Sequence, residues 1–486
     1  MIDILVIGGG PAGVTAALRA SELGAKVALV ESGRMGGTCT NDGCTPTRVL
    51  AKAARLRRDA EQQEIYGLVG APPELDFARL MAHAQHIVYK IHEKKQLIEH
   101  LSRAGVTVYP ESGPARFVDG HTVTLGNGTR LEADKVILSA GGHARRLDFP
   151  GAEYALTHSD IWSLKAPPRS IAIIGGAATG CQLASIFNGF GVQVSLFEIS
   201  PHILRVEDEA VAETVERSFE SRGIHLVTQF KGITSIEKGE GGLVLNYRLD
   251  SGPQTLATEA ILLSTGWLGN LDALNLAAAG VETKGPYVQV DDYLRSTAPH
   301  IFAAGDITGR MMLVQSAEYE AQVAAENAVL GVGRRNEHRI VPHGGFTDPE
   351  YGSVGLTEAQ ARAQHDCVAA VVPYANLDRA VIDGHTTGLC KLIVSRETHR
   401  LLGAHVVGEQ ALEVVEIAAA AMAADMWVEQ LAEIELAYPT FTAIVGLAAR
   451  AIVYELGVVP LAHEWQALGR EPAATWERRL DLSVAK

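Results

Sequence analysis

The sequence predicts an α/β fold of three domains, in which one type of parallel-sheet unit occurs twice and an α+β domain follows. Three observations support this prediction. A chain of 486 residues is too long for one ordinary core. A strand, a glycine-rich turn and a helix follow one another near residue 8, and the same order returns near residue 175. Beyond residue 340, a strand-like run at 392–394 precedes an alanine-rich helical pattern at 414–424.

The first unit begins at the N-terminus. The apolar run 4–7 indicates a buried strand, the next six residues read GGGPAG, and a helical pattern and the strand 27–30 follow. Gly8 permits the tight turn, Gly10 lets the backbone approach a pyrophosphate, and Gly13 lets helix and strand pack closely. Glu31 ends the second strand, where an acid takes ribose hydroxyls. This pattern is the Rossmann fingerprint for a dinucleotide.

The second unit repeats the first at an interval of 167 residues, from Gly8 to Gly175. Its strands lie at 171–174 and 194–197, its turn runs from Gly175 to Gly180, and its acid is Glu198. The spacing from last glycine to acid is 18 in both copies, from 13 to 31 and from 180 to 198. Two dinucleotide sites in one chain predict a flavin and a nicotinamide that exchange electrons. Glu198 favours NAD(H), and Arg205 leaves NADP(H) open as the alternative.

Composition and charge exclude several classes of partner. The apolar share of 47% and the charged share of 20% are typical of a globular protein. A net charge of -15 argues against nucleic acid, because phosphate binding needs a basic face. No apolar run approaches the roughly 20 residues that span a bilayer, and no secretory signal is recognised. We therefore expect a cytoplasmic enzyme that binds neither nucleic acid nor membrane.

A close cysteine pair follows the first unit. The stretch 36–48 reads GGTCTNDGCTPTR, with Cys39 and Cys44 ahead of a helical pattern at about 49–63. A helix N-terminus lowers the pKa of a thiol and favours the reactive thiolate. In a cytosolic chain such a pair is catalytic, redox-active or metal-binding more often than structural. The remaining cysteines, at 181, 367 and 390, are isolated and are expected in the core.

In these motifs the sequence resembles the pyridine nucleotide–disulfide oxidoreductases, which include dihydrolipoamide dehydrogenase, glutathione reductase and mercuric reductase. The resemblance covers about 1–460 and includes AAGD at 303–306 and FTDPEYGSVGLT at 346–357. It implies an FAD domain at 1–150 and 271–340, an NAD domain at 151–270, and a homodimer formed by an α+β dimerisation domain at 341–460. Residues 461–486 form a C-terminal extension whose role, capping or packing, stays open.

The resemblance also implies roles for individual residues. Cys44 would lie against the flavin as the charge-transfer thiolate, and Cys39 would be the interchange thiol. Asp306 would bind the ribityl chain of FAD, and Ala115 would lie by the adenine. The other residues predicted to contact FAD or NAD(H) by this resemblance, besides the fingerprint residues above, are Gly37, Thr38, Arg48, Gly141, Gly266 and Gly305. No resident metal site is predicted.

The sequence departs from the family where protons are handled. Disulfide-reducing members carry a His-Pro-x-x-x-Glu motif, whereas this chain has Tyr438 and Ala443 at those places. A phenol with a pKa near ~10 is a poor base at neutral pH. Arg48 and Gln182 occupy the places of a usual Lys–Glu pair beside the flavin. The vicinal C-terminal cysteines of mercuric reductases are absent, since the last cysteine is Cys390.

Three functions remain open at this point. In the first, the acceptor is a metal ion or a small molecule such as a quinone or dioxygen, whose reduction needs no histidine. In the second, the chain is a dithiol–disulfide oxidoreductase or thiol oxidase in which Tyr438 or water handles protons. In the third, it is a weakly catalytic flavoprotein that acts as a redox-responsive binding partner. The intact Cys39–Cys44 pair favours the first two.

Overall fold

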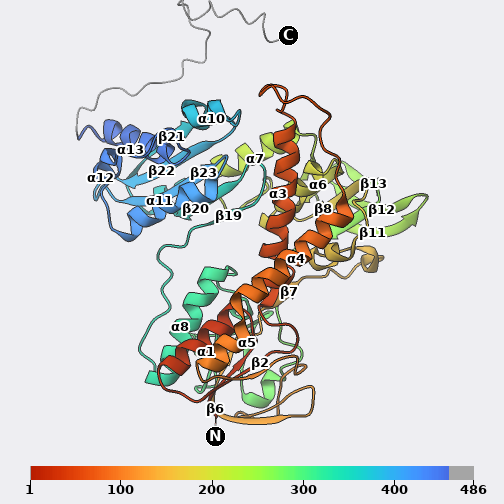
Figure 1. Ribbon diagram of the computed structural model, residues 1–486, viewed down its shortest axis with the longest axis vertical. Coiled ribbons are helices and arrows are strands. Elements are labelled where there is room, and N and C mark those ends of the chain that lie inside the picture. Colours follow the sequence, from red (N-terminus) through yellow and green to blue (C-terminus); the bar gives the residue numbers. More distant parts are fainter. Residues whose placement is uncertain (1, 459–486) are drawn as a thin grey trace, which may run out of the picture. The chain divides into compact units, whose positions relative to one another are not determined.

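The computed structural model describes residues 2–458, so the predicted 461–486 extension lies outside the described residues. The chain divides into two compact units, with the boundary between Gly355 and Leu356. The elements of each unit are labelled in Figure 1. The predicted α/β class is confirmed. None of the helices in the described part of the chain is long and apolar enough to cross a membrane.

The N-terminal sheet of the first unit has the order β3-β2-β1-β6-β5-β4, and β18 pairs with β6. β1, β2, β3 and β18 run parallel to their neighbours, as the strand–turn–helix pattern requires. Helices α1 and α8 pack side by side over this sheet (Figure 1). The bounds are β1 Ile2–Ile7, α1 Pro11–Glu22, β2 Val27–Val30, β3 Thr107–Tyr109, β4 Arg116–Phe117, β5 Thr122–Thr124, β6 Arg130–Leu138, β18 Ile301–Ala303 and α8 Val314–Leu330.

A second parallel sheet, with the order β10-β9-β8-β14, contains the repeated turn. The strands expected at 171–174 and 194–197 lie inside β8 and β9. An antiparallel sheet, β11-β12-β13, follows β10 in the chain. The bounds are β8 Ser170–Ile174, α6 Ala178–Gly189, β9 Gln193–Glu198, α7 Glu209–Ser221, β10 His225–Thr228, β11 Gly232–Gly239, β12 Gly242–Leu249, β13 Gly252–Thr258 and β14 Ala260–Leu263.

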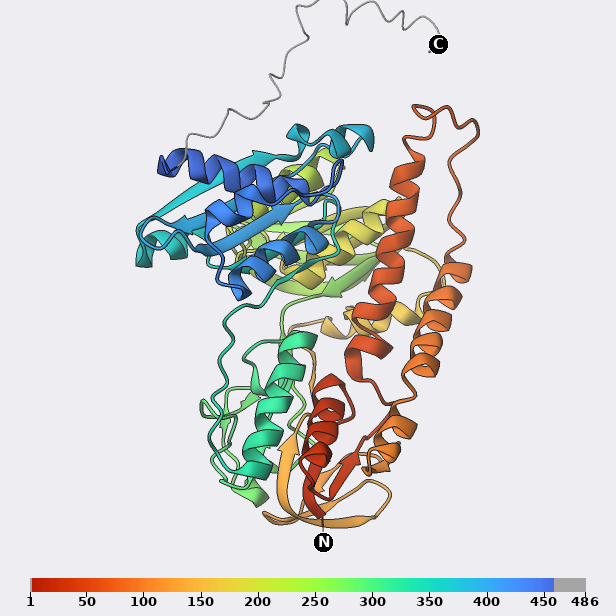
Figure 2. The ribbon, with the colours of Figure 1, turned by 60° about the vertical axis from the view of Figure 1, so that its left-hand side comes forward.

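A pair of packed helices, α3 and α4, extends from the first sheet and is seen most clearly in Figure 2. The predicted helix at 49–63 is α3, but it begins at Cys44 and ends at Ala60. Pro46 is tolerated there because the first turn of a helix leaves its N–H groups unpaired. A short helix ahead of it was not predicted. The bounds are α2 Gly37–Asn41, α3 Cys44–Ala60, α4 Phe77–Lys95 and α5 Leu97–Arg103.

An ion-pair network ties α3 to later parts of the first unit. Asp348 accepts from Arg58 at 2.5 Å and from Arg222 at 2.9 Å. Its backbone N–H donates to Ser185 Oγ at 2.9 Å. The Arg58 side chain is 9% exposed, so this carboxylate neutralises a charge that is almost completely buried. The network joins α3, α6 and the chain just after α7 to the loop before β20.

The remaining strands of the first unit are short. β7 and β15 pair with each other, as do β16 and β17, and β19 and β20. The pair β7–β15 connects the ends of the two nucleotide-binding sheets, because β7 follows β6 and β15 follows β14. The bounds are β7 Gly142–Ala144, β15 Trp267–Gly269, β16 Thr283–Lys284, β17 Tyr287–Val288, β19 His343–Gly345 and β20 Tyr351–Gly355.

The second unit, described from Leu356 to Val458, contains an antiparallel sheet β21-β22-β23. Helix α13 packs on β21 and β22, and α11 packs on β23. The predicted strand 392–394 is the middle of β22, and the predicted helix 414–424 is α11. The bounds are α9 Glu358–Gln364, β21 Cys367–Pro373, α10 Asp378–Ile382, β22 Leu389–Ser395, β23 Leu401–Val407, α11 Ala411–Ala423, α12 Val428–Glu433 and α13 Ala443–Leu456.

Candidate functional site

The first glycine-rich turn lies between β1 and α1 and has the geometry that a pyrophosphate needs. Gly8 has φ of +112°, and a Cβ there would lie 2.3 Å from Ser139 O. A Cβ on Gly13 would lie 1.7 Å from Gly8 O, and one on Gly37 would lie 2.8 Å from Gly10 Cα. These positions therefore admit only glycine. Gly37 therefore packs against Gly10 and Pro11, at the N-terminus of α1.

Glu31 is fixed by two backbone donors. Its Oε2 accepts from Gly9 N at 2.7 Å, and its Oε1 accepts from Gly33 N at 2.8 Å. Ser32 Oγ also donates to Oε1, at 3.2 Å. A carboxylate has about four lone-pair sites, so Oε2 can still accept from a ribose hydroxyl. The structure thus holds the predicted ribose ligand at the end of β2, beside the glycine turn.

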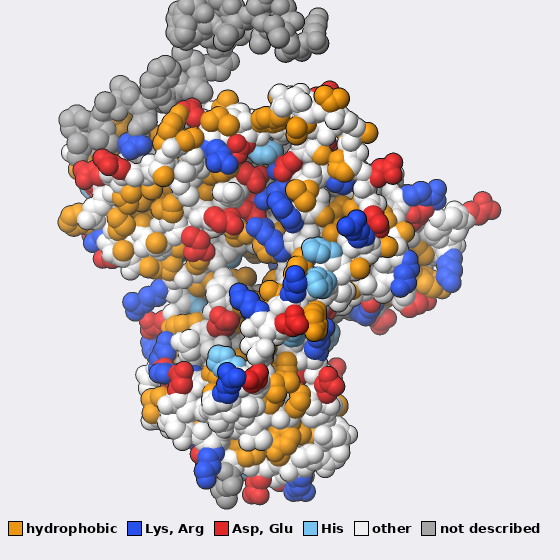
Figure 3. Space-filling view, viewed as in Figure 1, with side chains coloured by type: hydrophobic (Ala, Val, Ile, Leu, Met, Phe, Trp, Pro, Cys, Tyr) orange, Lys and Arg blue, Asp and Glu red, His pale blue; other side chains and the backbone are white. Residues whose placement is uncertain are grey.

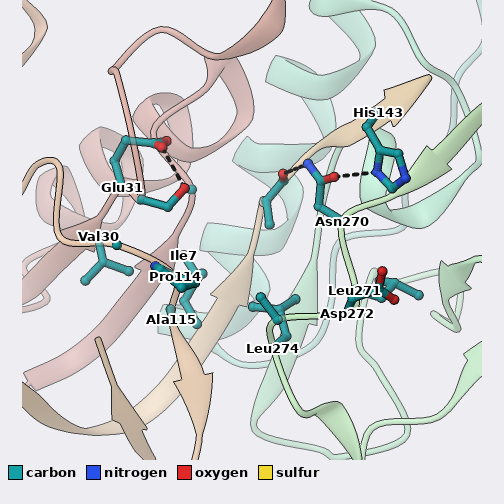
Figure 4. Close-up of a pocket in the computed structure, with 15 residues that line it drawn as sticks. Ile7, Val30, Glu31, Pro114, Ala115, His143, Asn270, Leu271, Asp272 and Leu274 are labelled. Atoms are coloured by element: carbon teal, nitrogen blue, oxygen red, sulfur yellow. Dashed lines mark hydrogen bonds between the residues drawn. The ribbon is translucent and has the colours of Figure 1, made fainter. Parts of the chain in front are cut away.

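A cavity of about 410 Å³ opens between this turn and the segment that follows the end of β15. Glu31 lies at one side of it and His143 and Asn270 at the other, with Ala115 between them (Figure 4). Its volume falls within the roughly 300–1,000 Å³ of small-molecule sites. The cavity is therefore large enough for the adenosine part of FAD, and Gly8, Glu31 and Ala115, which are predicted to bind FAD, line it. It is lined by Ile7, Gly8, Val30, Glu31, Ser32, Gly113, Pro114, Ala115, Ala140, His143, Asn270, Leu271, Asp272, Ala273 and Leu274.

His143 and Asn270 were not predicted as site residues. Asn270 Nδ2 donates to Ala140 O at 2.7 Å, so its Oδ1 faces His143 Nδ1, also at 2.7 Å. This arrangement makes Nδ1 the protonated nitrogen and leaves Nε2 without a role in the network. The two residues are 127 positions apart, so no local spacing in the sequence could have paired them.

The second glycine-rich turn has nearly the same backbone geometry as the first. Gly175 has φ of +110°, and a Cβ there would lie 2.2 Å from Ser264 O. A Cβ on Gly180 would lie 1.8 Å from Gly175 O. Glu198 accepts from Gly176 N at 2.8 Å and from Ser200 N at 2.9 Å. The predicted nicotinamide-nucleotide residues Gly175, Gly180 and Glu198 therefore meet in one place.

Two further predicted turns lie between the sheets. Gly141 O accepts from Asn270 N at 3.0 Å, and Gly266 O accepts from Arg145 N at 2.9 Å. Both turns border the β7–β15 pair. Trp267, the first residue of β15, acts on Asp306, because a hydrogen bond from its side chain lowers the pKa that burial raises. Its ring lies against His158, with centroids 5.2 Å apart.

Cys39 and Cys44 face each other at the junction of α2 and α3. Both are free thiols in this structure, Cys39 partly exposed and Cys44 exposed. The hydrogen bond from the Cys39 thiol lowers the pKa of Cys44 to about 7, while the same bond and burial raise the pKa of Cys39. Cys44 is therefore the more acidic thiol of the pair. The helix N-terminus, the cause anticipated from the sequence, is secondary to the neighbouring thiol.

Asp306 lies near Cys44. The negative charge of its carboxylate acts to raise the pKa of Cys44, and burial raises the pKa of Asp306 itself. Gly305 N donates to Glu320 Oε2 at 2.8 Å, which fixes the turn ahead of Asp306. Thr38 O accepts from Asp42 N at 3.0 Å and from Gly43 N at 2.7 Å, which closes the loop between the cysteines. The other three cysteines are buried, as expected.

Arg48 has a partner that the sequence did not reveal. Its Nη1 lies 2.5 Å from Glu350 Oε1, and its guanidinium lies 4.5 Å from the centre of the Phe346 ring. The Gln182 Oε1 accepts from Phe346 N at 3.1 Å. The usual Lys–Glu pair is thus replaced by an Arg48–Glu350 pair, with Gln182 bound to the same loop. Glu350 is fully buried and lies 302 residues from Arg48.

Two histidines missed by sequence reasoning lie beside the cysteine loop. His92 Nε2 is 2.8 Å from Asn41 Oδ1. His158 Nε2 is 3.9 Å from Asp42 Oδ2, and Ser159 Oγ donates to the same oxygen at 2.7 Å. Burial lowers the pKa of both histidines. They come from α4 and from the chain before β8, so only tertiary structure brings them to residues 41 and 42.

Tyr438 belongs to the second unit and is 75% exposed. Its hydroxyl donates to Asp378 Oδ2 at 2.5 Å, and this bond raises the pKa of the phenol. The raised pKa removes Tyr438 further from use as a base. Asp378 lies 60 residues away, at the start of α10, and was not predicted.

Comparison with known proteins identifies both units. The family model for pyridine nucleotide-disulphide oxidoreductases matches residues 2–321, and the model for their dimerisation domain matches residues 341–449. A mercuric reductase of Lysinibacillus sphaericus is 32% identical over 92% of this chain and 82% of its own length. A dihydrolipoyl dehydrogenase of Geobacillus stearothermophilus is 31% identical over 92% of this chain and 95% of its own length.

A solved structure shows the same fold. The HOCl-induced flavoprotein disulfide reductase RclA of Escherichia coli superposes with a TM-score of 0.82 at 25% identity, covering 93% of this chain and all of the other. Together with the two family matches and the two nucleotide-binding turns, this establishes which enzymes the chain is related to. The protein belongs to the pyridine nucleotide–disulfide oxidoreductase family of flavin-dependent enzymes, which use FAD and NAD(P)H.

Proposed function

We propose that this enzyme passes electrons from NADH, through FAD, to the Cys39–Cys44 pair and on to a small-molecule or metal-ion acceptor. The observation that carries the proposal is the hydrogen bond between the two sulfurs, which places one thiolate on Cys44 near neutral pH. Two thiols five residues apart with opposite pKa shifts are suited to open and close a disulfide. FAD, when bound, supplies the two-electron carrier between NADH and that disulfide.

The two thiols divide the work by position. Asp306, the predicted ribityl ligand, acts on Cys44, so Cys44 is the thiol on the FAD side. By the family resemblance Cys39 is then the thiol that meets the acceptor, although Cys44 is the more exposed of the two in the single chain. Glu31 and Glu198 orient the two dinucleotides by their ribose hydroxyls. Arg48 keeps a positive charge at the cysteine helix, and the buried Glu350 holds it in place.

Tyr438 supports an acceptor that needs no proton. Its only proton is engaged with Asp378, and the raised pKa keeps the phenol neutral. A metal ion or a quinone can take electrons without protonation of a departing thiolate, whereas disulfide exchange needs the leaving sulfur stabilised. Relatives include mercuric reductases, and one solved structure is described as a Cu(II) complex of the Escherichia coli reductase. These names support a metal-ion acceptor as the first candidate.

The homodimer follows from the dimerisation domain matched at 341–449. Several apolar side chains of the second unit are exposed in the single chain, among them Val381 at 58% and Tyr438 at 75%. In the proposed dimer, Tyr438 reaches Cys39 of the other subunit.

The second candidate is a dithiol–disulfide oxidoreductase or thiol oxidase. It is favoured by the adjacent, hydrogen-bonded cysteine pair and by relatives named dihydrolipoyl dehydrogenase and glutathione reductase. The third possibility, a weakly catalytic binding protein, is disfavoured because the relatives are enzymes.

Steady-state turnover with NADH separates the first two candidates. Metal ions and quinones are compared with glutathione disulfide, and dihydrolipoamide is tested with NAD+. The wild type is expected to reduce the metal ions and quinones and to be poor on both thiol substrates. Tyr438→His with Ala443→Glu should raise turnover of the thiol substrates tenfold or more, since a general acid/base contributes about 10²–10⁴-fold. Cys44→Ser should abolish turnover that uses the pair.

Wild-type turnover of either thiol substrate at tens to hundreds per second, the range of an efficient enzyme, would reverse the order of the two candidates. A Cys44→Ser variant as active as the wild type on every acceptor would contradict the proposal itself.

A further inference from the structure

The loop 199–208, which joins β9 to α7 and is called the ribose loop below, packs against the second glycine-rich turn. Leu204 N donates to Gly176 O at 2.7 Å. A Cβ on Gly176 would lie 2.8 Å from Ile203 Cγ2 and 3.0 Å from Glu198 Cβ, so the Ile203 side chain lies directly against the turn. The ribose loop therefore shapes the place where Glu198 is predicted to bind the ribose of NADH.

The middle of the ribose loop is bound by Glu216 of α7. Its Oε1 accepts from Ile203 N at 2.9 Å, and its Oε2 lies 3.1 Å from His202 Nδ1. The bond to Glu216 raises the pKa of His202, and Glu209 and Glu213 of the same helix act in the same direction. A protonated His202 thus forms an ion pair with Glu216.

The end of the ribose loop is bound by the β19–β20 hairpin. Glu207 Oε2 accepts from Ser353 Oγ at 2.7 Å, and Glu207 Oε1 lies 3.3 Å from His343 Nε2. The Glu207 side chain is 4% exposed, so its negative charge needs these partners. The ribose loop is therefore held at two points, by α7 and by the hairpin.

His343 has an acceptor at each ring nitrogen. Its Nδ1 lies 3.3 Å from Val341 O, and its Nε2 faces Glu207. A neutral imidazole has one N–H and an imidazolium has two, so only the protonated ring satisfies both contacts. The bond to Glu207 raises the pKa of His343 against the effect of burial. The other titratable groups beside this pair are Tyr351 of β20 and Cys181 of α6, and both stay neutral because burial raises their pKa values.

We propose that Glu207 and Glu216 are positioning residues for NADH. With their histidine partners they hold the ribose loop, and through it Glu198, against the second turn. The inference rests on the proposed binding of NADH at that turn.

Protonation of the two histidines should control how strongly the ribose loop is held. A histidine whose pKa is raised in the folded state contributes stabilisation that is complete below its ordinary pKa of about 6.5. That contribution is lost as the pH rises through the raised pKa. The loop should therefore be held less strongly, and NADH should bind more weakly, as the pH rises from about 6 to about 9.

Stopped-flow reduction of the flavin separates NADH binding from the reduction step. The dependence of the rate on NADH concentration gives an apparent Kd and a limiting rate at each pH. The wild-type Kd should rise roughly three- to tenfold between about pH 6 and about pH 9. His343→Gln keeps an N–H donor but removes the charge, so its Kd should exceed the wild-type value about threefold or more at the acid end. At the alkaline end the two values should agree within about twofold, and the limiting rates should agree within about twofold throughout.

Two variants test the contact with α7 independently of the hairpin. His202→Gln and Glu216→Gln should each raise the Kd for NADH at about pH 6 in the same way, His202→Gln by less because His202 is 51% exposed. They keep the proposal testable if His343→Gln fails to fold.

Several histidine side chains reach the surface of the molecule (Figure 3), so the pH profile needs a matched control. His225→Gln makes the same change in the same sheet. His225 is exposed and lies at the opposite end of the β9–β10 pair from Glu198, since His225 pairs with Ser195 and Thr228 pairs with Glu198. This variant should keep the wild-type dependence of Kd on pH.

Three results would overturn the proposal alone. The first is a ratio of variant to wild-type Kd that is the same at both ends of the pH range, as a merely structural role predicts. The second is a lowered limiting rate with an unchanged Kd, and the third is the same pattern in His225→Gln. A wild-type flavin that NADH does not reduce at any pH would overturn the proposed function together with it.

Discussion

The two nucleotide-binding turns share their backbone geometry but differ in what surrounds them. The first residue of each turn has nearly the same φ, +112° at Gly8 and +110° at Gly175. The strand that follows each turn and helix leads to an acid that accepts two backbone N–H bonds of 2.7–2.9 Å. After Glu31, however, the chain enters the segment that carries Cys39 and Cys44, whereas after Glu198 it leads to α7. The turn geometry is thus common to both nucleotide-binding sheets, and the Cys39–Cys44 pair follows the first of them.

The largest expected effect comes from adding one methyl group to either turn. Gly8→Ala should give protein without FAD, because the new Cβ would lie 2.3 Å from Ser139 O in a left-handed conformation. Gly175→Ala should retain FAD and stay yellow, but the rate of flavin reduction by NADH should fall roughly 100-fold or more. The reason is a similar clash, between the new Cβ and Ser264 O. Flavin absorbance and stopped-flow reduction measure the pair. If Gly175→Ala is colourless and Gly8→Ala is not, the assignment of the two nucleotides to the two turns is wrong.

The next effect concerns the two acids. NADH should reduce the wild-type flavin at least about tenfold faster than NADPH, because Glu198 repels a 2′-phosphate. Glu198→Gln should reduce the ratio of the NADH rate to the NADPH rate. Glu31→Gln should weaken FAD retention and leave that ratio unchanged. Stopped-flow rates with each nucleotide provide the ratio. Reduction by NADPH that equals reduction by NADH in the wild type would contradict the role given to Glu198.

The smallest effect is expected at the residues that begin the two helices. Gly10 and Ala177 occupy equivalent places with φ of -77° and -81°, which any residue adopts. Ala177 is exposed, so Ala177→Gly should change the NADH reduction rate by no more than about threefold. In Gly10→Ala the nearest atom to the new Cβ is Gly37 Cα, at 3.6 Å, so the variant should fold normally. It should bind FAD more weakly, because the methyl group would stand where the pyrophosphate approaches the backbone. Equal FAD affinity in Gly10→Ala and wild type would show that the pyrophosphate does not approach Gly10.

Sequence reasoning succeeded where the signal is local. The glycine turns, their strands and the acids 18 residues on are fixed by spacing within one supersecondary unit, so the fold class followed from them. Helix α2 was missed because Gly36 and Gly37 resemble a turn, and α3 began earlier than predicted because Pro46 falls in its first turn.

Contacts between distant segments could not be predicted in the same way. The partner of Arg48 lies 302 residues away at Glu350, and the partner of Tyr438 lies 60 residues away at Asp378. His92 was a helix residue without a visible role until α4 was placed against Asn41. These pairings depend on tertiary packing, and a single sequence carries no spacing rule for them.

The ion pair between Arg58 and Asp348 has a consequence for synthesis on the ribosome. The two residues are 290 positions apart, so at about 5–20 residues per second α3 waits roughly 15–60 s for the acid that neutralises Arg58. During that interval Arg58 lacks the Asp348 carboxylate, although Cys39 and Cys44 have already been synthesised. A nascent chain in oxidising conditions can therefore form mixed disulfides at Cys39 or Cys44 before the Arg58–Asp348 pair has formed.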